Sequence, residues 1–261
     1  MGPAFANVTR GAAGGFATFD ASYALGVFRA RTALALAVIA TCLGLVVTSG
    51  QSASAQSGQR CGYGALRVVI AGHERCLQRG VACRAKLNAA YHRYVFDCHQ
   101  GSLVYWWRGL LQRAVRIPRL SPGSPCPASE ATSLDDYGDY GGPRFGPGPA
   151  YPTLALRDGH ALLTYLIGWG YDGWDGTKVL WTVPRYSGPY IVRGRQLDGT
   201  GELRFDQGPA WTNKLHEELR LIGPYGDLNP AATFLRAPGC YAYQVDGRGF
   251  SYLIVFEAQP K

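Results

Sequence analysis

The sequence predicts a mainly β protein: an antiparallel β-sandwich or barrel in the C-terminal half, preceded by a small disulfide-stapled α+β module. Short β-rich runs recur at intervals of roughly ten residues across 151–261. Gly, Pro and Asp separate these runs, and no helical period competes with them. Six cysteines follow an apolar leader, and an even number in an exported chain predicts three disulfides.

Residues 1–55 have the pattern of a leader with a signal peptide. The basic residues Arg29 and Arg31 precede an apolar run, which ends at the small residues Ala53-Ser54-Ala55. Basic, apolar and small-residue segments in this order are typical of a cleavable signal peptide. We therefore expect a secreted or extracellular protein that associates with the cell envelope and whose mature chain begins at Gln56.

Two alternatives to cleavage remain open. Ile39-Ala40-Thr41-Cys42 approximates a lipobox, and lipidation of Cys42 would tether the chain to a membrane, although Thr41 is bulkier than the residue expected there. The apolar run would also serve as a retained anchor, but it is shorter than the ~20 residues of a spanning helix.

The start site is a separate open question. A start at Val27 in place of Met1 would give the signal peptide a compact basic beginning.

Charge divides the mature chain into two parts. Residues 56–120 contain eleven lysines and arginines against two acidic residues, whereas residues 121–261 contain twelve against fifteen. The net charge of the whole chain is +8, so the positive excess lies in the first part. This asymmetry predicts a basic Cys-rich module at 56–120 and a β-sandwich module at 151–261. A Pro/Gly/Asp-rich linker at 121–150 separates them, because Pro and Gly disfavour a regular helix.

The basic module, at about 60 residues, is small for a hydrophobic core, so its four cysteines are expected to form structural disulfides. A β-branched run predicts a strand at 65–70, and apolar residues at helical spacing predict a helix over 84–94. A helix of that length places Cys83 and Cys98 ~18 Å apart. It therefore disfavours a bond between them unless the chain doubles back after Tyr94. The pairing stays open among Cys61, Cys76, Cys83 and Cys98.

This module resembles a known cysteine pattern. Residues 76–83 have the form C-L-x-x-G-x-x-C, and residues 91–98 have the form Y-H-R-Y-x-F-x-C. Together they resemble a small Cys-rich module of uncharacterised exported proteins from high-GC Gram-positive, actinobacterial-type bacteria. Val95 stands where that module has glycine. The resemblance implies export and no particular activity.

The C-terminal module resembles the same group of exported proteins. The similarity lies in the run at 191–199 and in a predicted terminal hairpin, with strands at 240–245 and 250–256. Members of the group resemble Ig-like sandwiches, so the resemblance implies an antiparallel Ig-like β-sandwich here. It also implies a Cys126–Cys240 disulfide between the linker and the penultimate strand. No catalytic residues come with it.

Arginines alternate with aromatic residues in the basic module. The stretch 106–115 predicts a short amphipathic helix, with Arg108, Arg113 and Arg116 on or beside its basic face. Arginine and aromatic side chains together bind polyanions through counterion release and stacking. The expected partners are cell-wall polymer or an anionic membrane surface, and no specific nucleic acid. In the alternative interpretation, the aromatic residues fill a small core and the arginines keep the surface soluble.

No motif in the chain specifies catalytic chemistry. His73-Glu74 begins like a zinc-protease helix, but Leu77 stands where the second metal ligand would be. Neither a G-x-S-x-G turn nor a P-loop occurs. We therefore expect no catalytic residues, no metal site and no cofactor.

Two acidic loops are the best remaining candidates for a site. Three aspartates lie within 135–139. Asp172, Trp174 and Asp175 lie in the other loop, where carboxylates offer oxygen ligands and the indole offers a surface for stacking on a sugar. Neither loop has the spacing of a known calcium site, and Asp beside Gly is ordinary turn chemistry.

These observations predict a secreted non-catalytic protein of the cell envelope, with a binding or structural role and an unknown ligand. The alternative is a hydrolase that acts on envelope glycan or peptide through carboxylates of the Asp-rich loops. A pair of carboxyl groups in a cleft, one with a raised pKa, would favour the hydrolase, whereas a flat aromatic surface would favour the binder. The oligomeric state stays open.

Overall fold

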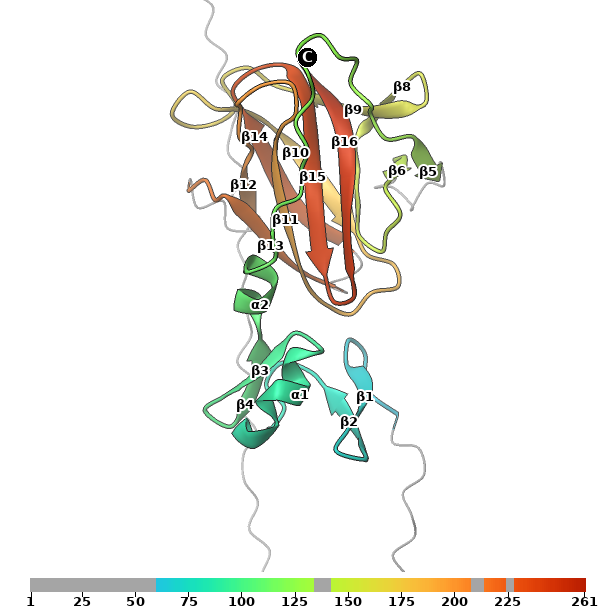
Figure 1. Cartoon of the computed structure of the whole chain (residues 1–261), viewed down its shortest axis with the longest axis vertical. Coiled ribbons are helices and arrows are strands. Elements are labelled where there is room, and N and C mark those ends of the chain that lie inside the picture. Colours follow the sequence, from blue (N-terminus) through green and yellow to red (C-terminus); the bar gives the residue numbers. More distant parts are fainter. Residues whose placement is uncertain (1–59, 134–141, 208–213, 224–227) are drawn as a thin grey trace, which may run out of the picture. The chain divides into compact units, whose positions relative to one another are not determined.

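The computed structural model describes residues 60–133, 142–207, 214–223 and 228–261, which belong to one compact unit of the chain (Figure 1). Among these residues, 51% lie in strands and 7% in helices, which confirms the prediction of a mainly β protein. No helix in these ranges is long and apolar enough to cross a membrane. The predicted leader and the aspartates of 135–139 lie outside the described residues.

The cysteine-rich region contains two hairpins and a short helical segment around its own hydrophobic core. Its elements are β1 (Leu66–Ile70), β2 (His73–Leu77), the 3₁₀ turn η1 (Ala85–Leu87), α1 (Asn88–His92), β3 (Phe96–His99) and β4 (Ser102–Tyr105). Its fully buried core side chains include Leu77, Tyr91 and Leu103. The strand predicted at 65–70 is present as β1. The predicted helix is shorter than expected, because α1 ends at His92.

The two disulfides of this region join Cys61 to Cys76 and Cys83 to Cys98. The second pairing is the one that the expected helix over 84–94 disfavoured unless the chain doubles back after Tyr94, and the chain does double back there. The chain doubles back at Val95 and brings the Cα atoms of the second pair to 5.7 Å. The reversal at Val95 therefore makes this pairing possible.

The reversal at Val95 depends on packing. Its φ is 62°, in the left-handed region that glycine adopts most easily and that strains a β-branched residue. The Val95 side chain is nevertheless buried, together with Leu110 and Ile191. Next to this turn, the His92 ring stacks on Trp106 with 3.8 Å between ring centroids. Contacts with residues distant in the sequence thus stabilise a turn whose backbone conformation is unfavourable for valine.

The remaining strands are β5 (Ala131–Ser133), β6 (Arg144–Phe145), β7 (Tyr151–Pro152), β8 (Ala155–Arg157), β9 (His160–Tyr165), β10 (Asp175–Thr182), β11 (Gly188–Gln196), β12 (Arg204–Gln207), β13 (Glu218–Gly223), β14 (Leu228–Leu235), β15 (Gly239–Gly247) and β16 (Phe250–Pro260). A four-stranded sheet has the order β12-β14-β10-β7, and a six-stranded sheet has the order β13-β11-β15-β16-β9-β8. Neighbours in both sheets are antiparallel except β16 and β9, which are parallel.

Side chains from both large sheets meet in one hydrophobic core. Trp181 of β10 lies 5.4 Å from Tyr243 of β15, and Tyr243 lies 4.5 Å from Phe256 of β16, measured between ring centroids. Because side chains alternate along a strand, the neighbours of Tyr243 on β15 face the other way. Cys240 and Ala242 accordingly belong to a second apolar cluster on the outward face of the six-stranded sheet.

A segment of chain covers this outward face. Residues 106–129, which we call the strap, begin with α2 (Trp107–Leu111) and run in green along the sheet in Figure 1. Ile117 and Leu120 of the strap pack into the cluster that contains Ala242. The predicted amphipathic helix is thus present in shortened form, and the chain after it is extended along the sheet.

The far end of the strap is bonded to the sheet. Cys126 forms a disulfide with Cys240, the pairing that the resemblance implies. Three residues further on, the backbone of Ser129 donates to the Val255 carbonyl, and its hydroxyl accepts the Val255 N–H. The beginning of the predicted linker is therefore fixed to the sheet.

Candidate functional site

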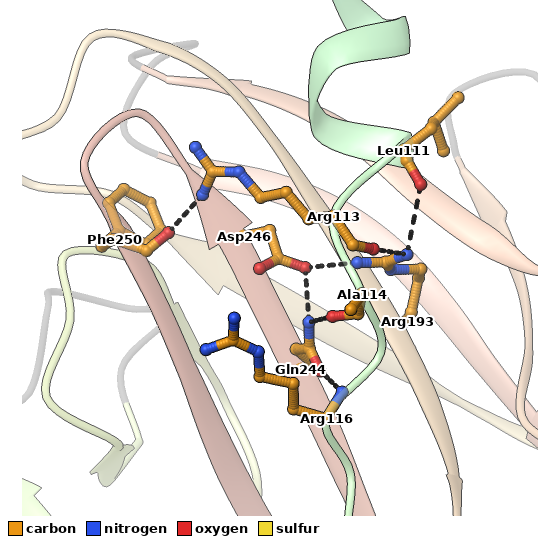
Figure 2. Close-up of polar contacts among 8 residues, drawn as sticks. All are labelled: Leu111, Arg113, Ala114, Arg116, Arg193, Gln244, Asp246 and Phe250. Atoms are coloured by element: carbon orange, nitrogen blue, oxygen red, sulfur yellow. Dashed lines mark hydrogen bonds and ion pairs between the residues drawn. The ribbon is translucent and has the colours of Figure 1, made fainter.

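Beneath the strap lies a cluster of buried polar side chains, shown in Figure 2. Arg193 of β11 and Gln244 and Asp246 of β15 form it, on adjacent strands of the six-stranded sheet. The Asp246 side chain is fully buried, and its Oδ2 atom accepts hydrogen bonds from Arg193 (2.7 Å) and from the Gln244 amide (2.9 Å). A buried carboxylate needs such partners, because it has lost its hydration.

The same side chains bind the backbone of the strap. Arg193 donates to the carbonyl of Arg113 (2.9 Å), and Gln244 donates to the carbonyl of Ala114 (2.9 Å). The side-chain oxygen of Gln244 accepts the N–H of Arg116 (2.6 Å). These bonds satisfy three main-chain polar groups of the strap. The cluster therefore positions the strap.

The three arginines predicted to bind a polyanion differ in their surroundings. Arg113 is half-buried, and its guanidinium donates to the carbonyl of Phe250 (2.8 Å). The side chains of Arg108 and Arg116 are exposed and form no ion pair with the described residues. Arg113 thus holds the strap against the β15–β16 hairpin, and the other two remain accessible to a ligand.

Most cations of residues 60–120 are exposed and lack an acidic partner. The two carboxylates of this region are occupied, because Glu74 pairs with Arg67 (2.7 Å) and Asp97 pairs with His92 (2.8 Å). The exposed cationic side chains without a carboxylate partner in the described part of the chain are Arg60, Arg79, Arg84, Lys86, Arg93, Arg108, Arg116 and Arg119. We call this set the basic surface. It produces an uncompensated positive field that attracts anions.

In the predicted loop site, the side chains of Asp175 and Trp174 contact neighbouring residues of the protein. A carboxylate oxygen of Asp175 accepts a backbone N–H of the same loop (2.8 Å). The guanidinium groups of Arg236 and Arg204 lie over the Trp174 ring, 4.5 Å and 5.5 Å from its centroid. Asp172 is exposed at the loop's tip. Within the described ranges, no three His, Cys, Asp or Glu side chains are grouped to hold a metal ion.

A groove of about 460 Å³ runs beside the strap. Arg119, Arg195 and Arg204 contribute to its lining. Arg204 pairs with Glu202 (2.6 Å) and Glu217 (3.5 Å), and Arg195 donates to a strap carbonyl. The groove therefore contains both positive and negative side chains, and its lining favours neither an anionic nor a cationic ligand.

A second cavity, of about 640 Å³, has no counterpart among the sequence predictions. Its lining residues are Arg144, Pro147, Gly148, Pro149, Tyr151, Pro184 and Arg185. We call it the Tyr151 pocket. The feature of the sequence that could have indicated this pocket is a Pro-Gly-Pro run close to a tyrosine. That run lies inside the segment interpreted as a linker.

Tyrosines of the shared core have raised pKa values. Burial raises the pKa of Tyr190 well above its ordinary value, and the nearby hydroxyls of Tyr252 and Tyr186 add to the effect. Burial also raises the pKa of Tyr243, although a hydrogen bond with the Thr233 hydroxyl (2.8 Å) opposes the rise. Both phenols are therefore neutral at physiological pH.

Stability is expected to fall at alkaline pH because of these tyrosines. A raised pKa in the folded state gives stabilisation that is complete below the unfolded pKa of about 10 and is lost as pH rises above it. Each buried phenol is expected to lower the free energy of unfolding by ~1.4 kcal/mol per pH unit in that range. Urea unfolding at a series of pH values measures this loss.

A single hydroxyl deletion provides the control. The Tyr190 hydroxyl is buried without a hydrogen-bond partner among the described residues, so Tyr190→Phe should leave stability at neutral pH nearly unchanged. It should also reduce the alkaline loss. An alkaline slope equal to that of the unaltered protein would show that Tyr190 does not cause it.

No family model, curated protein or solved structure matches this chain. Function is therefore inferred from the geometry and charge of the described residues.

Proposed function

We propose that the protein is a secreted, non-catalytic binding protein of the cell envelope, and that its basic surface binds anionic cell-wall polymer. The observation that supports this is the set of exposed cations without carboxylate partners. A polyanion gains affinity for such a surface by releasing its counterions. The aromatic rings of Trp106, Tyr105 and Phe96 are engaged with neighbouring rings, so charge is the expected source of affinity.

Three disulfides support an extracellular location. Such bonds persist in an oxidising environment and are rare where cellular thiols keep cysteines reduced. The predicted signal peptide agrees with this location. Secretion would place the basic surface beside the anionic polymers outside the membrane.

An Ig-like β-sandwich is the fold we propose for the strands from β7 to β16. Two sheets with a shared core support it, as do the strand orders. The order β7-β10-β14-β12 agrees with the A-B-E-D sheet of immunoglobulin domains, and β16-β15-β11 agrees with G-F-C. One difference is that β12 precedes β13 in the chain. A rigid frame of this kind displays loops for recognition.

The proposal predicts a salt-dependent affinity that depends on Arg108 and Arg116. The intact secreted chain should bind isolated anionic wall polymer, with an affinity that falls steeply as salt rises. Arg108→Gln/Arg116→Gln should reduce the slope of log K against log salt by about 1–2, since two phosphate or carboxylate contacts are lost. Binding titrations at several salt concentrations measure this slope.

The matched control is Lys178→Gln/Lys261→Gln, which removes the same charge from exposed positions outside the basic surface. It should leave the slope nearly unchanged. Equal effects of the two double variants would mean that only net charge matters. Binding to anionic lipid vesicles without binding to wall polymer would assign the surface to a membrane instead.

A further inference from the structure

Proline and tyrosine rings form part of the lining of the Tyr151 pocket. Pro147 and Pro149 precede β7, and Pro184 comes from the loop between β10 and β11. Gly148 has a φ of 81°, and a Cβ atom there would collide with the Tyr151 hydroxyl. Only glycine therefore lets this segment follow the tyrosine ring so closely.

Arg144 and Arg185 line the pocket, and no carboxylate among the described residues lines it. The Arg144 guanidinium lies over the Tyr151 ring, 5.6 Å from its centroid. Arg185 is exposed on the opposite loop and forms no ion pair with the described residues. A planar guanidinium in such a position suits bidentate contact with a phosphate or carboxylate.

The neighbourhood of Arg185 is also positive. Arg248 lies 5.9 Å from the ring centroid of Tyr186, the residue that follows Arg185, and its backbone N–H donates to the Tyr186 hydroxyl. Burial raises the pKa of Tyr186, and the charges of Arg248 and Arg113 oppose this rise. The field at this end of the two sheets therefore favours an anion.

We propose that the Tyr151 pocket binds one acidic unit of a glycan or polyol chain, with its ring or carbon backbone against Tyr151 and its anionic group on Arg185. Stacking surface and guanidinium lie in one cavity of about 640 Å³, which is large enough for a single saccharide unit. The pocket would add a specific subsite to the proposed polymer-binding protein. This inference rests on the proposed function, because that function names the polymer. Phosphate and carboxylate share the required chemistry.

The test compares three polymers of matched length on the intact secreted chain: poly(glycerol phosphate), polygalacturonate and neutral dextran. Calorimetric titration at one fixed ionic strength should show binding to at least one anionic polymer and none to dextran. Arg185→Gln should weaken that binding about tenfold, the loss expected for one charge-assisted contact. Tyr151→Ala should weaken it severalfold, whereas Tyr151→Phe should keep it, because the ring supplies the surface.

Lys178→Gln is the control, since it removes one exposed charge from β10 outside the pocket. If the Arg185→Gln and Tyr151→Ala variants bind like this control, the proposal that the pocket binds the polymer is wrong. The proposed role of the basic surface would still stand if Arg108→Gln/Arg116→Gln weakens binding. The better of the two anionic polymers identifies the source of the anion. Unaltered unfolding curves for Arg185→Gln would show that its effect concerns binding.

Discussion

Replacing Cys126 and Cys240 together, as Cys126→Ser/Cys240→Ala, is expected to lower the free energy of unfolding by about 4–5 kcal/mol. The disulfide closes a loop with a sequence separation of 114 residues, so its loss frees a large conformational ensemble in the unfolded chain. It also releases the end of the strap from the outward face of the six-stranded sheet. Urea unfolding under non-reducing conditions measures the change.

The matched control is Cys61→Ala/Cys76→Ala, whose disulfide has a sequence separation of 15. The loop-entropy model gives about 3 kcal/mol for a loop of that size, so the control should be the less destabilising of the two. The opposite order would mean that non-covalent contacts, and not the disulfide, hold the strap. Limited proteolysis within 113–119 would then be unchanged in the Cys126→Ser/Cys240→Ala variant.

Asp246→Ala is the second change with a large expected effect, a loss of about 3–5 kcal/mol in the free energy of unfolding. The Asp246 side chain is fully buried and that of its partner Arg193 is only 13% exposed. Removing the carboxylate leaves the guanidinium charge buried without its counterion, and also removes an acceptor from Gln244. Denaturant unfolding checks the magnitude.

Two further variants separate charge from packing. Arg193→Met/Asp246→Leu removes both charges and should restore much of the lost stability, since an apolar pair of similar volume carries no desolvation penalty. Glu257→Ala breaks the exposed ion pair with Arg157 and should cost about 1 kcal/mol or less. A loss for Asp246→Ala as small as that for Glu257→Ala would show that water reaches the cluster beneath the strap.

Local sequence was sufficient for the elements whose contacts are local. The predicted C-terminal hairpin is present as β15 and β16, paired from Gly239 with Ala258 to Gly247 with Phe250. Alternating apolar residues define its faces, and Gly249 at φ 79° permits the tight turn. The strand β1 follows from its β-branched run. Both assignments needed only neighbours along one hairpin.

The helix over 84–94 was overestimated because periodicity does not record where a helix must end. Apolar spacing continues past His92, but the chain reverses at Val95 in a backbone conformation that its side chain disfavours. Packing with Ile191, almost one hundred positions further along the chain, offsets that strain. Packing between residues so distant in the sequence cannot be recognised from the local sequence around Val95.

The sequence by itself determined the mainly β class, the even number of cysteines after the leader, the basic character of 56–120 and the strands with clear local patterns. These properties depend on composition and on neighbours one or two positions apart. Tertiary structure alone decided which cysteines of the basic region pair and that the strap covers a face of the sheet. It also made Arg113 a structural donor, while Arg108 and Arg116 stay exposed, and it brought Arg185 beside Tyr151. The physical reason is that each outcome depends on two segments meeting in space, and a side chain's burial and partners exist only after they have met.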